Sequence, residues 1–340
     1  MNVERIIRLS DPKERKQVED FLARFDLSFE DQVDYTVALY RDDQMIGTGS
    51  LKGSVLRNVA IDETIQGEGL LAKIISLLVA EGARQGIFSF QLFTKPEKVK
   101  FFEWAGFRKV AVAEPWAALL EIGIGGVNAF CETVKDQVSP TECKRSALVM
   151  NCNPFTLGHQ KLVEYASMNS EEVVLFVVEE NESVFPFEDR IELVRKGTAH
   201  LPNVKVVPSG KYIISSATFP TYFVKGKDAL EAQTLLDVNV FAERIAPSLG
   251  ICKRFIGEEP TDGTTQAYNE ALKKVLPTQG IEVEVIPRFQ VDKEVISASK
   301  VRRAIMERDF DSIKSCVPCC TYEYLGSEKG IVICERLQKK

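Results

Sequence analysis

The residue types best suited to chemistry lie close together between Thr156 and His159. Thr156 supplies a hydroxyl and His159 an imidazole, and Gly158 between them has no Cβ to crowd a ligand. Residues 146–150 form an apolar run typical of a buried strand, and the apolar spacing of residues 162–166 indicates a helix. The start of a helix presents free N–H groups and a partial positive charge. The segment therefore predicts a binding site for phosphate groups.

A second group of polar residues lies far downstream. Ser297 and Ser299 are suited to cap a helix, and Lys300 and Arg302 would carry positive charge at its opening. An ordinary capped helix with surface charges would give the same pattern. If the fold brings this group beside the first one, its side chains would instead hold phosphate oxygens.

Strands and helices alternate after about residue 144. Four apolar runs fit strands, at residues 173–178, 204–208, 254–257 and 281–286, with helical segments between them. This alternation predicts a Rossmann-like, doubly wound parallel sheet, whose ligands bind beyond the carboxyl ends of the strands. The first polar group follows one of these ends.

The two polar groups resemble the paired signatures of the nucleotidyltransferase superfamily. N-P-F-T-L-G-H at 153–159 is similar to its (H/T)-x-G-H motif, and I-S-A-S-K-V-R at 296–302 is similar to its I-S-x-(S/T)-x-x-R motif. The resemblance implies an ATP site, with Mg²⁺ accompanying the triphosphate. Its catalytic candidates are His159, Thr156, Lys300 and Arg302. Its ATP-binding candidates are Asn153, Pro154, Phe155, Gly158, Ser297, Ser299, Arg190 and Gly257.

The N-terminal part indicates another phosphate-binding turn. The opening residues fit a helix, and strands are expected at residues 35–40, 45–51 and 55–61. A Gly-rich turn with Gln66, Gly67 and Gly69 then leads into an apolar helix face. With the segment 98–110, this part resembles the GNAT acetyltransferase family. The resemblance implies that the turn binds CoA or a pantetheine arm.

Two positions depart from the GNAT pattern. Thr64 stands where the family's loop has Arg or Gln, and Phe102 stands where a tyrosine commonly acts as general acid. Because phenylalanine cannot donate a proton, we expect this domain to dock a pantetheine arm or its carrier protein without doing chemistry. A cut in the chain near Ser139 would test this hypothesis.

The whole chain resembles the citrate lyase ligase family, through its domain order and the segments F-P-F-E-D-R at 185–190 and G-E-E-P-T-D-G-T-T-Q-A-Y-N-E at 257–270. The resemblance implies that acetate is activated with ATP and that the acetyl group passes to a thiol on the acyl carrier (gamma) subunit of citrate lyase. The expected domains are a GNAT-like domain at 1–127, a linker at 128–143 and a nucleotidyltransferase-like domain at 144–340.

Composition narrows the class of protein. The 340 residues suffice for two domains, and 43 Lys and Arg against 49 Asp and Glu argue against nucleic acid as the main partner. No stretch approaches the ~18 apolar residues that span a membrane, so we expect the cytoplasm. Cys316, Cys319 and Cys320 contain a C-x-x-C without a second ligand pair, so no metal site is expected.

Three alternatives stay open. A nucleotidyltransferase acting on a phosphometabolite such as phosphopantetheine would use the same signatures, and its consumption of ATP would not depend on acetate. A GNAT-type N-acetyltransferase would transfer acetyl groups without ATP. A nucleotide sensor would bind ATP without turnover. Arg190, Lys161 and the pair Glu258 and Glu259 could each be surface residues, and His200 is expected to lie at a helix end.

Overall fold

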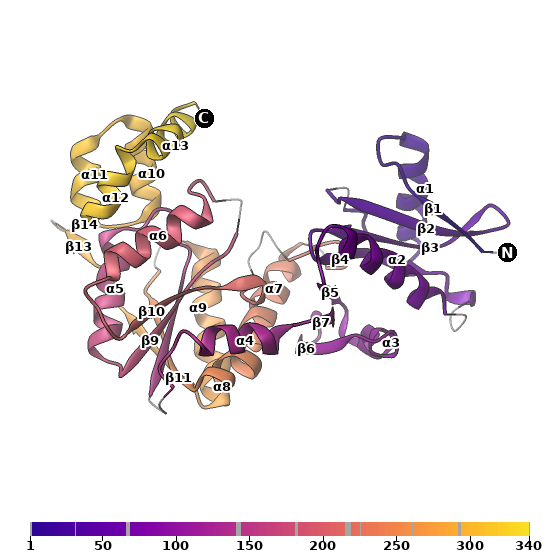
Figure 1. The fold of residues 1–340 in the computed structure, drawn as a ribbon, viewed down its shortest axis with the longest axis horizontal. Helices are drawn as coiled ribbons and strands as arrows, with labels where there is room; N and C mark the ends of the chain where they lie inside the picture. The colour runs from indigo at the N-terminus through magenta and orange to yellow at the C-terminus, as the bar shows by residue number, and fades with distance from the viewer. Residues whose placement is uncertain are drawn as a thin grey trace. The chain divides into compact units, whose positions relative to one another are not determined.

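The chain folds into two compact units, which a computed structural model describes for residues 2–30, 32–65, 69–140, 144–180, 183–214, 219–224, 226–259, 262–291 and 294–339 (Figure 1). Unit 1 comprises Met1–Ala129 and Thr218–Asn239. Unit 2 comprises Phe130–Ala217 and Val240–Lys340. Among the described helices, none combines the length and apolar character needed to cross a membrane.

Unit 1 is built on a seven-stranded sheet in the order β1-β2-β3-β4-β5-β7-β6. Only β4 and β5 pair in parallel, through two residues of each strand, and the other pairs are antiparallel. The strands are β1 (Val3–Ile6), β2 (Tyr35–Arg41), β3 (Gln44–Lys52), β4 (Val55–Ile61), β5 (Ser89–Thr94), β6 (Arg108–Ala113) and β7 (Ala117–Gly123). The helices are α1 (Pro12–Ala23), α2 (Leu70–Arg84) and α3 (Val99–Trp104), with short 3-10 turns at Glu63–Ile65 and Pro96–Lys98.

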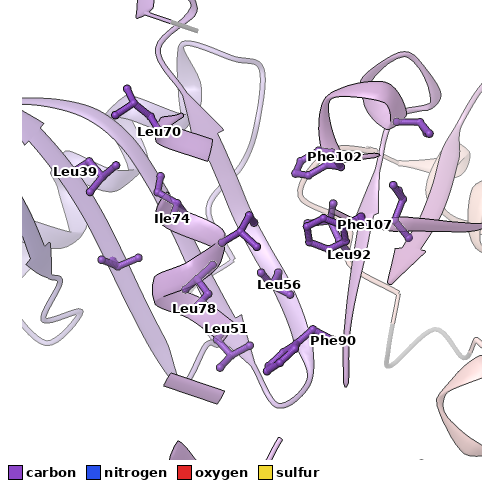
Figure 2. Close-up of a cluster of buried hydrophobic side chains, with 14 of the residues drawn as sticks. Leu39, Leu51, Leu56, Leu70, Ile74, Leu78, Phe90, Leu92, Phe102 and Phe107 are labelled. Carbon is purple, nitrogen blue, oxygen red and sulfur yellow. The ribbon is translucent and has the colours of Figure 1, made fainter. Parts of the chain in front are cut away.

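The main core of unit 1 lies between α2 and the sheet (Figure 2). Ile74 and Leu78 point from α2 toward Leu39 and Leu51 of the strands, and all four side chains are buried. Gly49 allows this close approach, because a Cβ there would lie 2.7 Å from Ile74 Cγ2. The apolar helix face expected after the Gly-rich turn is therefore confirmed.

The opening of the chain differs from the expectation. Residues Val3–Ile6 form edge strand β1, paired with β2, and the first helix starts only at Pro12, where the Asp11 side chain caps it. The helix expected for the opening residues was wrong at 3–6. Every residue of β1 is exposed, so no alternation of apolar residues reveals the strand, and pairing with β2 decides its conformation.

A segment from the middle of the sequence completes unit 1. The Phe219 ring packs edge-on against Phe93 with centroids 5.6 Å apart, and Tyr222 donates a hydrogen bond from its hydroxyl to Phe93 O at 3.2 Å. At the end of α7 (Lys227–Val240), Asn239 Nδ2 donates to Val112 O at 2.7 Å. The expected domain boundaries place this segment in the nucleotidyltransferase-like domain at 144–340, whereas its contacts named above are with strands of unit 1.

Unit 2 is built on a five-stranded parallel sheet in the order β10-β9-β8-β11-β12. Its strands are β8 (Arg145–Met150), β9 (Glu172–Val177), β10 (Val204–Pro208), β11 (Ile251–Gly257) and β12 (Glu282–Ile286). A two-stranded hairpin follows, β13 (Gln290–Val291) and β14 (Glu294–Val295). The expected fold class is confirmed: an α/β chain with a GNAT-like mixed sheet and then a Rossmann-like parallel sheet.

Helices cover both faces of the parallel sheet. Val163 of α5 (Leu157–Met168) and Val194 of α6 (Phe187–Thr198) pack with Leu148 and Phe255 on one face. On the other face Phe241 lies edge-on to Phe176.

Four C-terminal helices gather around a smaller apolar cluster (Figure 1, yellow). The remaining helices are α4 (Val127–Lys135), the π-helical turn Phe241–Ile245, α8 (Ala246–Leu249), α9 (Gly263–Val275), α10 (Ala298–Glu307), α11 (Phe310–Cys316), α12 (Cys319–Leu325) and α13 (Glu328–Gln338), with short 3-10 turns at Gly210–Tyr212 and Leu276–Gln279.

Candidate active site

The turn between β8 and α5 is held by contacts on both sides. Cys152 has a left-handed backbone (φ 54°), and the Asn153 side chain accepts a hydrogen bond from Phe185 N at 3.0 Å. Phe155 is fully buried, and its carbonyl accepts from the Thr321 hydroxyl at 3.0 Å. The turn therefore fixes where α5 begins.

Thr156 and His159 cap α5 reciprocally. Thr156 Oγ1 accepts from His159 N at 3.3 Å, and His159 Nδ1 accepts from Thr156 N at 3.1 Å. Thr156 Oγ1 also lies 3.0 Å from Nδ1, and because a backbone N–H can only donate, the bond from Thr156 N favours a neutral ring with Nδ1 unprotonated. The proton of that ring is then on Nε2, which leaves an N–H donor for a ligand.

The surroundings of His159 favour this neutral form. The ring is half-buried and stacks on Phe155, with centroids 6.0 Å apart and planes 11° apart. Burial, followed by the nearby positive charge of Arg288, lowers the pKa of His159 from 6.5 to about 4. At neutral pH the imidazole can therefore donate a hydrogen bond without carrying a charge.

The second signature lies next to the first. Ser297 caps α10 and accepts from Lys300 N at 3.1 Å. A Cβ on Gly158 would lie 3.3 Å from Ile296 O, so the starts of α5 and α10 are in near contact. Glycine at 158 keeps this approach free of a tight Cβ contact. Two helix N-termini thus point into the same region, where their partial positive charges add.

Arg302 reaches this region from the first turns of α10. It donates from Nη1 to Asn153 O and from Nη2 to Ser299 Oγ at 3.1 Å. Burial lowers the pKa of Arg302, but a guanidinium stays charged at neutral pH. Its bond to the turn after β8 joins the two signatures directly.

These groups border a cavity of about 950 Å³ beyond the carboxyl ends of β8 and β11. Its size is within the range of ligand sites in proteins. Eight of the residues expected from the sequence line it: Asn153, Thr156, Gly158, His159, Gly257, Ser297, Ser299 and Arg302. Lys161, Glu258 and Glu259 line it as well.

Four expected site residues do not line the cavity. Pro154 and Phe155 are buried in the turn, and the backbone N–H of Lys300 donates to the Ser297 cap. Arg190 is fully buried, and its guanidinium donates to carbonyl groups of Asn151, Val178, Glu180 and Phe185 and to the Asn151 side chain. The structure gives Arg190 the role of joining the loops after β8 and β9.

Other cavity-lining cations were missed from the sequence. Arg288 donates from Nε to Glu258 O at 3.0 Å and forms an ion pair with Glu259. Arg254 of β11 also lines the cavity, with Tyr268 and Asn269 of α9. Their spacing matches no signature, and nothing in the sequence around an arginine inside a strand shows that it borders a cavity.

Unit 1 contains a second cavity, of about 620 Å³. Gly69 lines it, whereas Gln66 and Gly67 lie outside the described residues. Apolar side chains including Phe102, Trp104 and Phe223 form most of its wall, and Lys95 and Lys98 supply positive charge. Tyr222 and Phe223 of the middle segment line the cavity too.

No metal cluster is formed by the residues that the structure describes, since no three His, Cys, Asp or Glu side chains among them could hold an ion together. The described cysteines, including Cys316, Cys319 and Cys320, are free thiols.

The parallel sheet and the two facing helix starts define unit 2 as a nucleotide-binding α/β domain of the nucleotidyltransferase type. Residues 145–325 match the family profile described as the citrate lyase ligase C-terminal domain. The chain is 34% identical over 328 residues to the [citrate [pro-3S]-lyase] ligase of Klebsiella pneumoniae, covering 95% of this chain and 96% of that protein. It is 33% identical over 325 residues to the enzyme of the same name from Escherichia coli K12, covering 94% and 92%. The chain belongs to the citrate lyase ligase family.

Among solved structures, Thermotoga maritima TmcAL bound with alpha-thio ATP aligns with 56% of this chain and 57% of its own, at 14% identity and a TM-score of 0.38.

Proposed function

We propose that this protein is an AMP-forming acid–thiol ligase that activates acetate with ATP and acetylates the prosthetic-group thiol of the citrate lyase acyl carrier (gamma) subunit. Family membership along nearly the whole chain carries the proposal, and the cavity of unit 2 supplies a site for it. The chain acts in the cytoplasm.

The reaction has two steps. An acetate oxygen attacks the α-phosphorus of ATP, the bond to the bridging oxygen breaks, and pyrophosphate leaves with the bonding electrons. The carrier thiolate, having lost its proton to water or buffer, then attacks the carbonyl carbon of acetyl-AMP and releases AMP. Both steps need positioning and charge stabilisation and no covalent enzyme intermediate.

The described side chains are suited to that task. His159 can donate from Nε2 to a phosphate oxygen, because Thr156 N–H occupies its Nδ1. Arg302 contributes a fixed positive charge beside the same helix start. The N-termini of α5 and α10 add backbone N–H groups. Bound Mg²⁺ would neutralise part of the triphosphate charge.

The deciding experiment measures pyrophosphate release from ATP and Mg²⁺ by the full-length protein, with acetate, with phosphopantetheine, or with neither. Acetate-dependent release is expected. Release that requires phosphopantetheine and ignores acetate would make the protein a nucleotidyltransferase instead. Acetyl transfer from acetyl-CoA without ATP would favour a GNAT-type N-acetyltransferase.

We also propose that the cavity of unit 1 receives the pantetheine-like arm of the carrier. Its mostly apolar wall, with Lys95 and Lys98 on either side of Glu97 in sequence, fits a mainly uncharged arm that ends in a phosphate ester. A cut near Ser139 is a poor test, because Phe219, Tyr222 and Asn239 would be separated from the strands they contact.

Two matched variants on α2 test this cavity in the intact chain. Ala72 is exposed and lines the cavity, whereas Ala80 is exposed on the same helix and does not. Ala72→Trp should raise the KM for the carrier by about tenfold or more, and Ala80→Trp should leave it unchanged. Acetate-dependent pyrophosphate release should be normal in both. Equal KM values in the two variants would rule the cavity out.

A further inference from the structure

Trp104 of α3 lies on the surface of unit 1 instead of in a core. It is 79% exposed, although most of a tryptophan is usually buried. Phe101, one helical turn earlier, is 41% exposed, and the two rings meet edge-on with centroids 5.7 Å apart. The two rings therefore form one continuous apolar surface.

The opposite side of α3 anchors these rings. Val99 and Phe102 of the helix are buried in the main core of unit 1. Phe102 packs edge-on against Phe107 with ring centroids 5.7 Å apart (Figure 2). Because the helix is fixed to the core, a partner that binds its exposed rings does not have to order a loop.

The same two rings border the cavity of unit 1. Phe101 and Trp104 both belong to its lining. A side chain that is 79% exposed is not enclosed by the cavity wall, so Trp104 lies at the mouth. Any molecule that enters the cavity while attached to a larger body will hold that body close to these rings.

Lysines outnumber carboxylates around the aromatic pair. The charged residues of this segment are three lysines and two glutamates: Lys95, Lys98, Lys100, Glu97 and Glu103. Lys98 Nζ lies 5.6 Å from the centroid of the Phe101 ring, and Lys100 lies one turn before Trp104. Within the described ranges none of the five forms an ion pair, whereas Lys73 of α2 pairs with Glu4. The surface thus combines apolar area with a small excess of positive charge.

We propose that Phe101, Trp104 and Lys100, here called the α3 surface, bind the protein body of the acyl carrier whose arm enters the adjacent cavity. The arm is covalently attached to the carrier, so an arm inside the cavity brings the carrier itself to the mouth. The lysines match acidic side chains on the carrier, and the two rings match an apolar patch beside them.

This inference rests on the proposed function and extends it from the arm to the protein that bears the arm. A lipid surface is a poorer match for the α3 surface. Membrane binding strengthens with the apolar area that is buried, and two rings on a helix of 6 residues offer little of it. The carrier, in contrast, needs only a small contact, because its arm binds as well.

The first experiment measures binding of the carrier to the full-length protein by calorimetry, with the prosthetic group present (holo) or absent (apo). The variants are Trp104→Ala and the control Phe88→Ala, since Phe88 is 56% exposed in unit 1 and does not line the cavity. Wild type should bind the apo carrier, more weakly than the holo carrier. Trp104→Ala should weaken both by about tenfold or more, and Phe88→Ala should match wild type.

Lys100→Glu separates docking of the carrier from binding of its arm, because Lys100 does not line the cavity. This variant should weaken binding of apo and holo carrier by about threefold or more at low salt, and by less at high salt. Lys13→Glu is the control, since it makes the same charge change at an exposed lysine of α1 outside the cavity lining. Lys13→Glu should bind the carrier like wild type.

Three results would overturn the inference. Carrier binding could be unchanged in both Trp104→Ala and Lys100→Glu. A loss confined to the holo carrier would assign the α3 surface to the arm alone. Binding of wild type to phosphatidylserine vesicles that Trp104→Ala abolishes would assign it to a lipid surface. The proposed function is tested separately, because pyrophosphate release that ignores acetate would refute it whatever the carrier binding.

Discussion

Replacing His159 separates two roles that the structure gives to one side chain. Its Nδ1 accepts Thr156 N–H and so caps α5, and its Nε2–H is the donor proposed for a phosphate oxygen. His159→Ala removes both groups. His159→Asn retains a side-chain oxygen that can accept at the cap but places no donor at the position of Nε2.

The expected magnitudes of the two losses differ enough to be told apart. Loss of a helix cap costs about 1 kcal/mol of stability, a small part of the ~5–15 kcal/mol of a typical domain. Loss of one donor to a reacting phosphate typically costs about a hundredfold to a thousandfold in kcat. Because the destabilised variant remains folded, the cap alone cannot produce a rate loss of that size.

The assay is acetate-dependent pyrophosphate release at saturating ATP and acetate, with stability measured by urea unfolding. Both variants should lose about a hundredfold or more in kcat, and only His159→Ala should lose about 1 kcal/mol. His200→Ala is the control, because that exposed histidine lies near Glu164 and outside the cavity lining. If His159→Asn kept a kcat within about threefold of wild type, the donor role would be refuted.

Three further predictions concern folding, titration and reactivity. Arg190→Met should destabilise unit 2 by about 3 kcal/mol or more in urea unfolding, because it leaves buried carbonyl groups without donors. The pKa of His159 is lowered from 6.5 to about 4, so between those pH values the unfolded chain binds more protons than the folded one. The unfolding free energy of wild type should therefore be greatest above pH 6.5 and should decrease toward pH 4. This decrease, measured as unfolding free energy against pH, should be up to about 3 kcal/mol larger in wild type than in His159→Asn. Burial raises the pKa of the Cys152 thiol, so iodoacetamide at pH 8 should leave Cys152 unlabelled in the folded protein and should label the exposed Cys252. Mass spectrometry measures both labels, and equal labelling rates would contradict the structure.

Local patterns were sufficient to predict the strand, turn and helix around His159. The apolar run at 146–150 became β8, and Ser297 caps α10 as expected. These features depend on neighbours in sequence, through hydrogen bonds that span three residues. The pairing of the two signatures came from the resemblance, and the structure shows their contact at Gly158 and Ile296.

Features that depend on distant residues were not predictable in the same way. Arg190 occupies a helix start, and only the loops that fold over it decide that its guanidinium is buried rather than turned to a ligand. From the sequence alone Arg254 is an ordinary strand residue, and it is buried only because Tyr268 of α9 and Phe241 pack against it. The assignment of Phe219 and Tyr222 to unit 1 likewise depends on Phe93, more than a hundred residues earlier.

The middle segment has a consequence for how the protein is made. The chain passes from one unit to the other after residues 129, 217 and 239. During synthesis, all seven strands of the unit 1 sheet are therefore made early, but Phe93 lacks its contact with Phe219, and Val112 O its hydrogen bond from Asn239, until residue 239 has emerged. Domains that fold as the ribosome proceeds usually finish in chain order. In this chain, unit 1 is completed only after about half of unit 2 has been made. A stalled nascent chain from which residue 219 has not emerged should therefore expose apolar surface to chaperones, and one from which residue 239 has emerged should not.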